Sequence, residues 1–263
     1  MAIIERTMDW LRLKDDRNTL CSAVIVAAGE SLRMGAEDKL FIEICGEPVL
    51  AHTLMAFQKA ERVSEIVVVA REECLKRVGL LCRAFRIHKA VKIMAGGETR
   101  LDSAYFGAFA VSENAGLIAI HDGARPCVSD HVITCAIVAA ARHHAAAPGL
   151  AVSSTMKRAK GRLIAETVDR EGLFEIQTPQ VFDADLIRAA LTKARKKGIA
   201  VTDDCQAAEL IGAPVYISEG SRNNIKITTG DDLVVAEAIL RSRETILRSR
   251  ELMSIWRTYG EEP

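Results

Sequence analysis

The sequence predicts an α/β protein with a mostly parallel, twisted sheet, helices on both faces and a projecting β-hairpin arm. Three observations support this prediction. Short runs rich in β-branched residues alternate with longer stretches whose apolar residues recur at helical spacing. The short runs are continuously apolar, as is typical of strands in a parallel sheet that helices cover on both faces. One segment, residues 155–171, breaks this order with two polar runs of strand character.

Six short runs are predicted to be strands that belong to βαβ units. In chain order they are SAVIVA (22–27), EIVVVA (65–70), AVKIMA (90–95), GLIAIH (116–121), PGLAVS (148–153) and PVYIS (214–218). Ligands of parallel sheets bind beyond the carboxyl ends of the strands. We therefore expect the functional residues to follow the strands.

The helices are predicted where apolar residues recur at i, i+3, i+4 and i+7. These stretches are residues 48–60, 100–111, 130–144 and 183–197, and a long helix is expected from Asp231. Within that last helix LRSRE occurs twice, at 240 and 247, which is too few copies for a coiled coil and favours a solvated basic face. In residues 155–171, Lys160-Gly161 separates the two polar runs, which predicts a hairpin arm.

Composition narrows the possible function. The 263 residues include 35 Lys and Arg and 35 Asp and Glu, so the electrostatic basis for general binding to nucleic acid or an anionic membrane is missing. Small-molecule partners are favoured instead. The seven cysteines contain no C-x-x-C pair and predict reduced thiols in a cytoplasmic protein. No apolar run approaches the ~20 residues of a membrane span, and charges interrupt any signal-like segment in residues 1–20.

The loop after the first strand reads AAGESLRMG, with Lys39 shortly beyond it. Glycines let the backbone turn tightly, so that main-chain N–H groups approach an anion while Arg33 and Lys39 neutralise it. This pattern is consistent with triphosphate binding, although it is neither G-x-G-x-x-G nor a P-loop. Taken alone, it is equally consistent with an ordinary turn that carries two surface cations.

Further polar motifs follow later strands. Gly96-Gly97 opens the segment GGETRLDS, where exposed amides and a hydroxyl could read a base edge, or where an ordinary cap begins a helix. HDGARP places Asp122 and Arg125 at the same end of the sheet, either for a ligand or as a structural ion pair. His121 is expected to be structural, because no metal ligand lies at a suitable spacing. Smaller motifs follow at TMK (155–157), TVDR (167–170), QTPQ (177–180), TDD (202–204) and NNIKIT (223–228).

Together these motifs resemble, in order and spacing, the 2-C-methyl-D-erythritol 4-phosphate cytidylyltransferase family, from about Ala23 to Leu240. The resemblance implies a Rossmann-like nucleotidyltransferase fold. It also implies transfer of CMP from CTP to a sugar-alcohol phosphate with release of pyrophosphate, in the non-mevalonate isoprenoid pathway. Mg²⁺ would be bound mainly through the CTP phosphates, with protein ligands unknown. The chain departs from the usual family pattern at Ser31 and Ser154, where glycine and aspartate are common.

The resemblance also implies roles for individual residues. Arg33 and Lys39 would stabilise the transition state at the α-phosphate. The backbone of Ala28, Gly29 and Glu30 would cradle the triphosphate, and the region of Gly97, Glu98 and Ser103 would recognise cytosine and ribose. The remaining implied residues surround the sugar phosphate: Asp122, Arg125, Thr155, Arg170, Thr202 and Lys226. Of these, Arg170 and Lys226 are expected to be catalytic.

Two alternative functions remain open at this point. One is a cytidylyltransferase for ribitol 5-phosphate or another polyol phosphate, although TVDREGLF and TDD favour the methylerythritol substrate. The other is a catalytically silent nucleotide-binding protein on the same fold. The expected organisation is an N-terminal extension (1–20), a nucleotidyltransferase domain (21–240) and a C-terminal helical extension (241–263). In this family the arm crosses to a partner subunit, which predicts a homodimer.

Overall fold

The computed structural model describes residues 20–29 and 38–259, with side chains described as far as residue 246. The strands are β1 (Cys21–Ala27), β2 (Glu43–Ile44), β3 (Glu47–Pro48), β4 (Val63–Ala70), β5 (Ala90–Ala95), β6 (Leu117–Asp122), β7 (Ala145–Ala151), β8 (Met156–Lys160), β9 (Leu163–Val168), β10 (Phe174–Ile176), β11 (Gln180–Asp183) and β12 (Tyr216–Glu219). The helices are η1 (Lys39–Phe41), α2 (Val49–Lys59), η2 (Glu72–Cys74), α3 (Leu75–Ala84), α4 (Arg100–Ala110), α5 (Asp130–His143), α6 (Ala184–Lys196), α7 (Asp204–Glu209) and α8 (Gly230–Tyr259).

The main sheet has the order β10-β7-β11-β6-β1-β4-β5, and β12 pairs with β7. The strands β6, β1, β4 and β5 run parallel, whereas β11 is antiparallel to both β6 and β7. The prediction of a mostly parallel α/β sheet is confirmed. The sequence analysis missed β10 and β11, because three or four residues next to a polar motif carry no period of their own.

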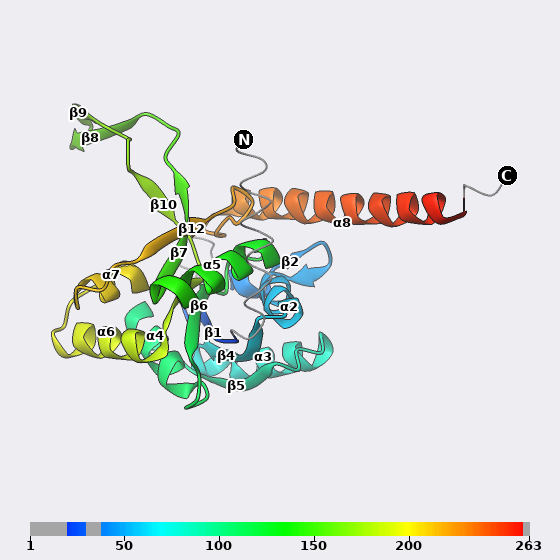
Figure 1. Cartoon of the computed structure of the whole chain (residues 1–263), viewed down its shortest axis with the longest axis horizontal. Coiled ribbons are helices and arrows are strands. Elements are labelled where there is room, and N and C mark those ends of the chain that lie inside the picture. Colours follow the sequence, from blue (N-terminus) through cyan, green and yellow to red (C-terminus); the bar gives the residue numbers. More distant parts are fainter. Residues whose placement is uncertain (1–19, 30–37, 260–263) are drawn as a thin grey trace.

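Helices cover both faces of this sheet, so the fold has three layers (Figure 1). One apolar core packs α2, α3 and α5 against the face that includes Ala23 and Ile25 of β1. The other packs α4, α6 and α7 against the face that includes Val24. Successive side chains of a strand point to opposite faces, which explains why β1 must be apolar throughout.

Most predicted helices begin or end within two residues of the expected positions, whereas α3 and α7 were missed. The start of β7 was placed too late, at residue 148, because residues 145–147 are alanines that carry no β-branched strand pattern. His144 adopts φ 66° and ends α5 as a left-handed C-cap, so that β7 begins directly at Ala145. The long helix expected from Asp231 is α8, and it runs without a break across residue 240.

The predicted arm is the antiparallel pair β8–β9, which projects from the body in Figure 1. Its turn is formed by Gly161, at φ 62°, and Arg162. All five residues of β8 are exposed. Among the described residues, no helix is both long and apolar enough to cross a membrane.

Candidate active site

A cavity of about 750 Å³ opens at the carboxyl ends of β1, β4, β5 and β6. This is the edge of the sheet where the sequence analysis expects functional residues. The cavity is lined by Val26, Ala27, Ala28, Gly29, Lys39, Leu40, Arg71, Gly97, Glu98, Thr99, Arg100, Ser103, Asp122, Ala124, Lys226 and Thr228. Volumes of this size are typical of small-molecule sites.

The wall formed by the β5–α4 turn depends on two glycines. A Cβ atom on Gly96 would lie 2.5 Å from the Cβ of Ala28, and one on Gly97 would lie 2.3 Å from the Cβ of Asp102. Glycine at 96 therefore lets this turn approach the loop after β1, and glycine at 97 lets it pack closely against α4. Thr99 and Asp102 cap α4 reciprocally, and Ser103 Oγ accepts a hydrogen bond from the N–H of Gly97 at 3.2 Å. The exposed backbone of this turn is thus held against the cavity.

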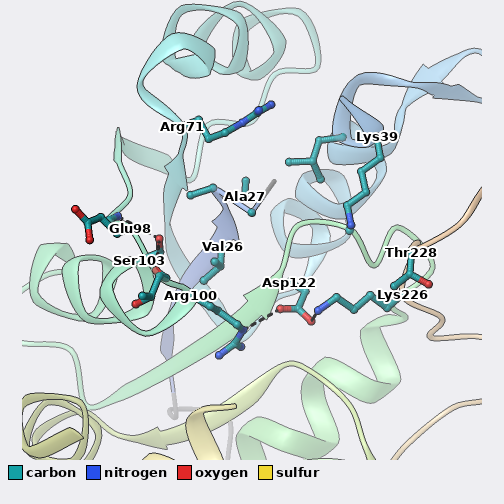
Figure 2. A pocket seen from close by; sticks show the side chains of 16 residues that line it. Val26, Ala27, Lys39, Arg71, Glu98, Arg100, Ser103, Asp122, Lys226 and Thr228 are labelled. Carbon is teal, nitrogen blue, oxygen red and sulfur yellow. Dashed lines mark hydrogen bonds and ion pairs between the residues drawn. The ribbon is translucent and has the colours of Figure 1, made fainter. Parts of the chain in front are cut away.

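Asp122 lies at the centre of a cationic cluster on the cavity floor (Figure 2). Its carboxylate is 2.9 Å from Lys226 Nζ, 3.4 Å from Arg100 Nε and 3.5 Å from Arg125 Nε. Burial by itself raises the pKa of this carboxyl, but Arg100, Lys226 and Arg125 outweigh it and hold the pKa well below its usual range. Asp122 is therefore ionised at neutral pH and fixes the three cations relative to one another.

The backbone of the NNIKIT segment positions Lys226. The N–H of Ile227 donates to the carbonyl of Ala124 at 2.8 Å, and Arg125 Nη1 donates to the carbonyl of Asn224 at 2.7 Å. Asn224 is fully buried, and its amide donates to the carbonyl of Thr178 at 2.9 Å. These contacts hold the chain on either side of Lys226.

Arg100 is positioned by a second, buried carboxylate. Asp204 is 0% exposed and receives two hydrogen bonds from the Arg100 guanidinium, at 3.1 and 2.8 Å. Burial lowers the pKa of Arg100, but Asp204 and Asp122 outweigh it, so the guanidinium stays charged. Gln180 holds the backbone at Asp204 in place, because its Oε1 accepts hydrogen bonds from the N–H groups of Asp204 and Cys205 at 2.9 and 3.0 Å. The QTPQ and TDD motifs therefore meet behind the cavity.

Two further cations line the opposite side of the cavity. Lys39 Nζ donates to the carbonyl of Ile227 at 3.1 Å. Arg71, just after β4, forms an ion pair with Asp38 and a longer one, at 3.5 Å, with Glu73. Figure 2 shows Lys39 on the far side of Asp122 from Arg100.

His121 lies in the core beneath this cluster. It is 0% exposed, its Nδ1 is 3.0 Å from Thr178 Oγ1, and its ring lies 4.8 Å from that of Phe57. Burial lowers its pKa to about 3, with Arg125 adding to the effect against the opposing charge of Asp122. The imidazole is therefore neutral at physiological pH, in line with a structural role.

The structure brings most of the predicted site residues to this cavity. Those that line it are Ala28, Gly29, Lys39, Gly97, Glu98, Ser103, Asp122 and Lys226. Arg125 lies behind Asp122, and Thr202 is exposed beside Gln206, near the start of α7. Thr155 and Arg170 are exposed at the arm, where Arg170 donates to the carbonyl of Ser153. Glu30 and Arg33 lie outside the described residues.

The sequence analysis assigned no role to Arg71, Arg100, Asp204 or Thr228. Arg100 and Asp204 do occur in motifs that it singled out, GGETRLDS after a predicted strand and TDD after a predicted helix, so membership in these motifs was a usable signal. Their pairing was not predictable, because 104 residues separate them in the chain.

Comparisons with known proteins identify the family of this chain. Residues 21–242 match the family model described as IspD, 2-C-methyl-D-erythritol 4-phosphate cytidylyltransferase. The 2-C-methyl-D-erythritol 4-phosphate cytidylyltransferase of Halalkalibacterium halodurans is 43% identical over 224 residues, which are 85% of this chain and 98% of that protein. The protein of the same name from Caldanaerobacter subterraneus is 45% identical over 226 residues, 84% of this chain and 98% of that one.

Solved structures give the same result. The Thermus thermophilus 2-C-methyl-D-erythritol 4-phosphate cytidylyltransferase superposes with a TM-score of 0.70 at 34% identity, over 83% of this chain and 98% of that one. The 4-diphosphocytidyl-2C-methyl-D-erythritol synthase of Anaerococcus prevotii gives a TM-score of 0.75 at 30% identity, over 85% and 96% of the two chains. With its cationic cavity at the strand ends, the chain belongs to the 2-C-methyl-D-erythritol 4-phosphate cytidylyltransferase family.

Proposed function

We propose that the cavity binds CTP and 2-C-methyl-D-erythritol 4-phosphate together and transfers CMP from the first to the second. The observation that carries this proposal is the convergence of cations from separate strand-end loops on one cavity: Lys39, Arg71, Arg100 and Lys226. Two polyanionic substrates repel each other, so a site that joins them needs this excess of positive charge. The family membership favours this activity over a different polyol phosphate or a silent protein.

In the proposed reaction, a phosphate oxygen of methylerythritol phosphate attacks the α-phosphorus of CTP. The new P–O bond forms as the bond to the β-phosphate oxygen breaks, and pyrophosphate leaves with that electron pair. Such a step requires alignment and stabilisation of negative charge, and no protein nucleophile. Lys39, with Arg33 implied by the resemblance, is assigned to the charge that develops on the α-phosphate.

The other predicted site residues divide between the two substrates. The backbone of Ala28 and Gly29, with Glu30, is assigned to the triphosphate, and Gly97, Glu98 and Ser103 to cytosine and ribose. Supporting this, the Gly97 backbone faces the cavity beside the N-terminus of α4. The sugar phosphate is assigned to Lys226, whose ammonium Asp122 holds at 2.9 Å, together with Arg125, Thr155, Arg170 and Thr202.

A divalent cation, Mg²⁺, fits this cavity only if the substrate supplies most of its oxygen ligands. Among the described lining residues, the carboxylates are Asp122 and Glu98. Asp122 already pairs with three cations, so its single negative charge attracts a metal ion only weakly. We therefore propose that triphosphate oxygens supply most of the ligands of this ion, and that the bound ion would supply charge neutralisation.

We further propose that the protein is a homodimer in which each arm completes the partner's site. The arm carries Leu163 and Ile164, which are 78% and 68% exposed, so apolar surface is left uncovered by the chain itself. Arg170 and Thr155 lie at this arm and outside the lining of their own cavity. A cytoplasmic location is also proposed, supported by seven cysteines that form no disulfide.

Mixing two inactive variants tests the shared site. Arg170→Ala removes the arm cation and Lys226→Ala removes the body cation, so each homodimer is expected to be inactive. If the site is shared, a mixed dimer has one site with both residues intact, and an equal mixture regains about a quarter of wild-type activity after subunit exchange. If both residues act within one chain, mixing restores nothing.

Pyrophosphate release, measured with CTP and each candidate phosphate, tests the activity. We expect product with methylerythritol phosphate and little with ribitol 5-phosphate. Product with ribitol 5-phosphate alone would instead identify the alternative substrate. Binding of CTP without product from either phosphate would indicate a silent protein.

A further inference from the structure

A group of potential metal ligands lies where α5 packs against β12, outside the cavity described above. His131 and Cys135 are four residues apart on α5, so they share one face of the helix. Glu219 is the last residue of β12, which runs beside that face (Figure 1). Among residues 20–29 and 38–246, these three side chains are the group of His, Cys, Asp or Glu whose ligand atoms lie close enough to hold one ion, all within 4.8 Å.

Two of the three distances between the ligand atoms suit a tetrahedral site. His131 Nε2 is 3.3 Å from Glu219 Oε2 and 3.6 Å from Cys135 Sγ. Typical zinc bonds of about 2.0–2.1 Å to nitrogen or oxygen and about 2.3 Å to sulfur place neighbouring ligands about 3.3–3.6 Å apart. Two of the three separations therefore already fit. Because Sγ also lies 3.8 Å from Nδ1, the exposed imidazole of His131 has to turn to aim its Nε2 lone pair at the ion. The third separation, between the Glu219 carboxylate and Cys135 Sγ, can shorten by rotation of the Glu219 side chain, which is exposed and lies at the end of its strand.

The donor set indicates which ion would bind. An imidazole nitrogen, a thiol sulfur and one carboxylate together suit Zn²⁺ and related first-row ions, whereas Mg²⁺ and Ca²⁺ require oxygen ligands. The pKa of Cys135 is raised to about 11 by burial and by the carboxylates of Glu219 and Asp130, so its sulfur is protonated in the metal-free protein. A bound ion must therefore displace that proton to the buffer.

We propose that His131, Cys135 and Glu219 bind one Zn²⁺ ion per chain, with water as the fourth ligand. The ion joins the N-terminal part of α5 to the end of β12. From Glu219 the chain continues directly to the segment that holds Asn224 and Lys226, so the ion fastens one end of that segment. This site is separate from the substrate cation of the proposed reaction and does not depend on it.

Titration of the chelator-treated, full-length protein with Co²⁺, a spectroscopic substitute for Zn²⁺, tests the proposal. We expect one equivalent to give sulfur-to-cobalt charge-transfer absorption, which Zn²⁺ abolishes and excess Mg²⁺ leaves unchanged. Cys135→Ser should remove that absorption. His131→Ala and Glu219→Gln should each weaken Zn²⁺ binding by about 100-fold or more, because outer-shell changes alone already cost 10–100-fold.

Cys82→Ser is the matched control, because Cys82 is 8% exposed on α3 and Cys135 is 9% exposed on α5. The control is expected to keep the absorption, and zinc should raise the Tm of the control and wild type but not of Cys135→Ser. If Cys135→Ser fails to fold, the zinc affinities of His131→Ala and Glu219→Gln test the proposal, because both of these side chains are exposed. The proposal is overturned if no charge-transfer absorption develops, if it persists in Cys135→Ser, or if His131→Ala and Glu219→Gln bind zinc as tightly as wild type.

Discussion

Replacing Asp122 by asparagine keeps the side-chain shape but removes the charge on which three cations converge. The most buried of them, Arg125, has a side chain 10% exposed, and those of Arg100 and Lys226 are 27% and 40% exposed. Breaking a buried ion pair costs about 3–5 kcal/mol, and an exposed pair contributes about 1 kcal/mol or less. Arg100 keeps Asp204 and Arg125 keeps a backbone carbonyl, so we expect a loss of about 2–3 kcal/mol.

The effect on catalysis should separate binding from turnover. Without the Asp122 charge the cavity becomes more positive, so the KM for CTP should stay the same or fall. Lys226 loses the partner at 2.9 Å that aims its ammonium, and kcat should fall by about 100-fold, the cost of misplacing a group by an ångström. Steady-state kinetics with both substrates measure this, with the exposed Asp231→Asn as a control that should match wild type.

The pH dependence of stability provides the test of the electrostatic reasoning. The three cations hold the pKa of Asp122 below its ordinary value in the folded protein. The stability advantage of wild type over Asp122→Asn is therefore complete above about pH 4 and shrinks below it, by up to about 1.4 kcal/mol per pH unit. Urea unfolding of both proteins from pH 7 to pH 3 measures the difference. An advantage that does not change with pH would refute the reasoning.

Two other substitutions test the site and the core. Lys39→Ala should lower kcat/KM by about 10²–10³-fold with little change in Tm, because a preorganised donor contributes about 3–4 kcal/mol to the transition state. The control is Lys92→Ala, at an exposed lysine outside the cavity. Equal losses of kcat/KM in both variants would contradict the assignment of Lys39. Gly107→Ala places a Cβ 2.2 Å from Val24 Cγ1, and the overpacking should cost about 1–3 kcal/mol in thermal or urea unfolding. Gly79→Ala, also on a helix but with its nearest neighbour 3.8 Å away, should instead stabilise by about 0.5–1 kcal/mol, and a loss there as large as at Gly107 would rule out the steric explanation.

The strands that the sequence predicted best are those whose own residues are apolar and β-branched. β1 and β4 begin within two residues of the predicted positions. Their Val and Ile runs indicate a strand that is covered on both faces, whatever its neighbours in the sheet. β11 was missed, since Gln180–Asp183 becomes a strand only through pairing between β6 and β7. The helix α7 begins at Asp204, whose buried carboxylate pairs with the distant Arg100.

The sequence by itself determined the order of strands and helices, the position of the polar motifs at strand ends and the family. These properties depend on local periodicity and on motifs that each occupy a few consecutive residues. Only the tertiary structure decided which charges meet: Asp122 with Lys226 and Arg100 with Asp204, each pair separated by 104 residues, and Arg71 beside the cavity. An ion pair forms where two side chains come within a few ångströms, and that depends on strand order and packing, which no local pattern specifies.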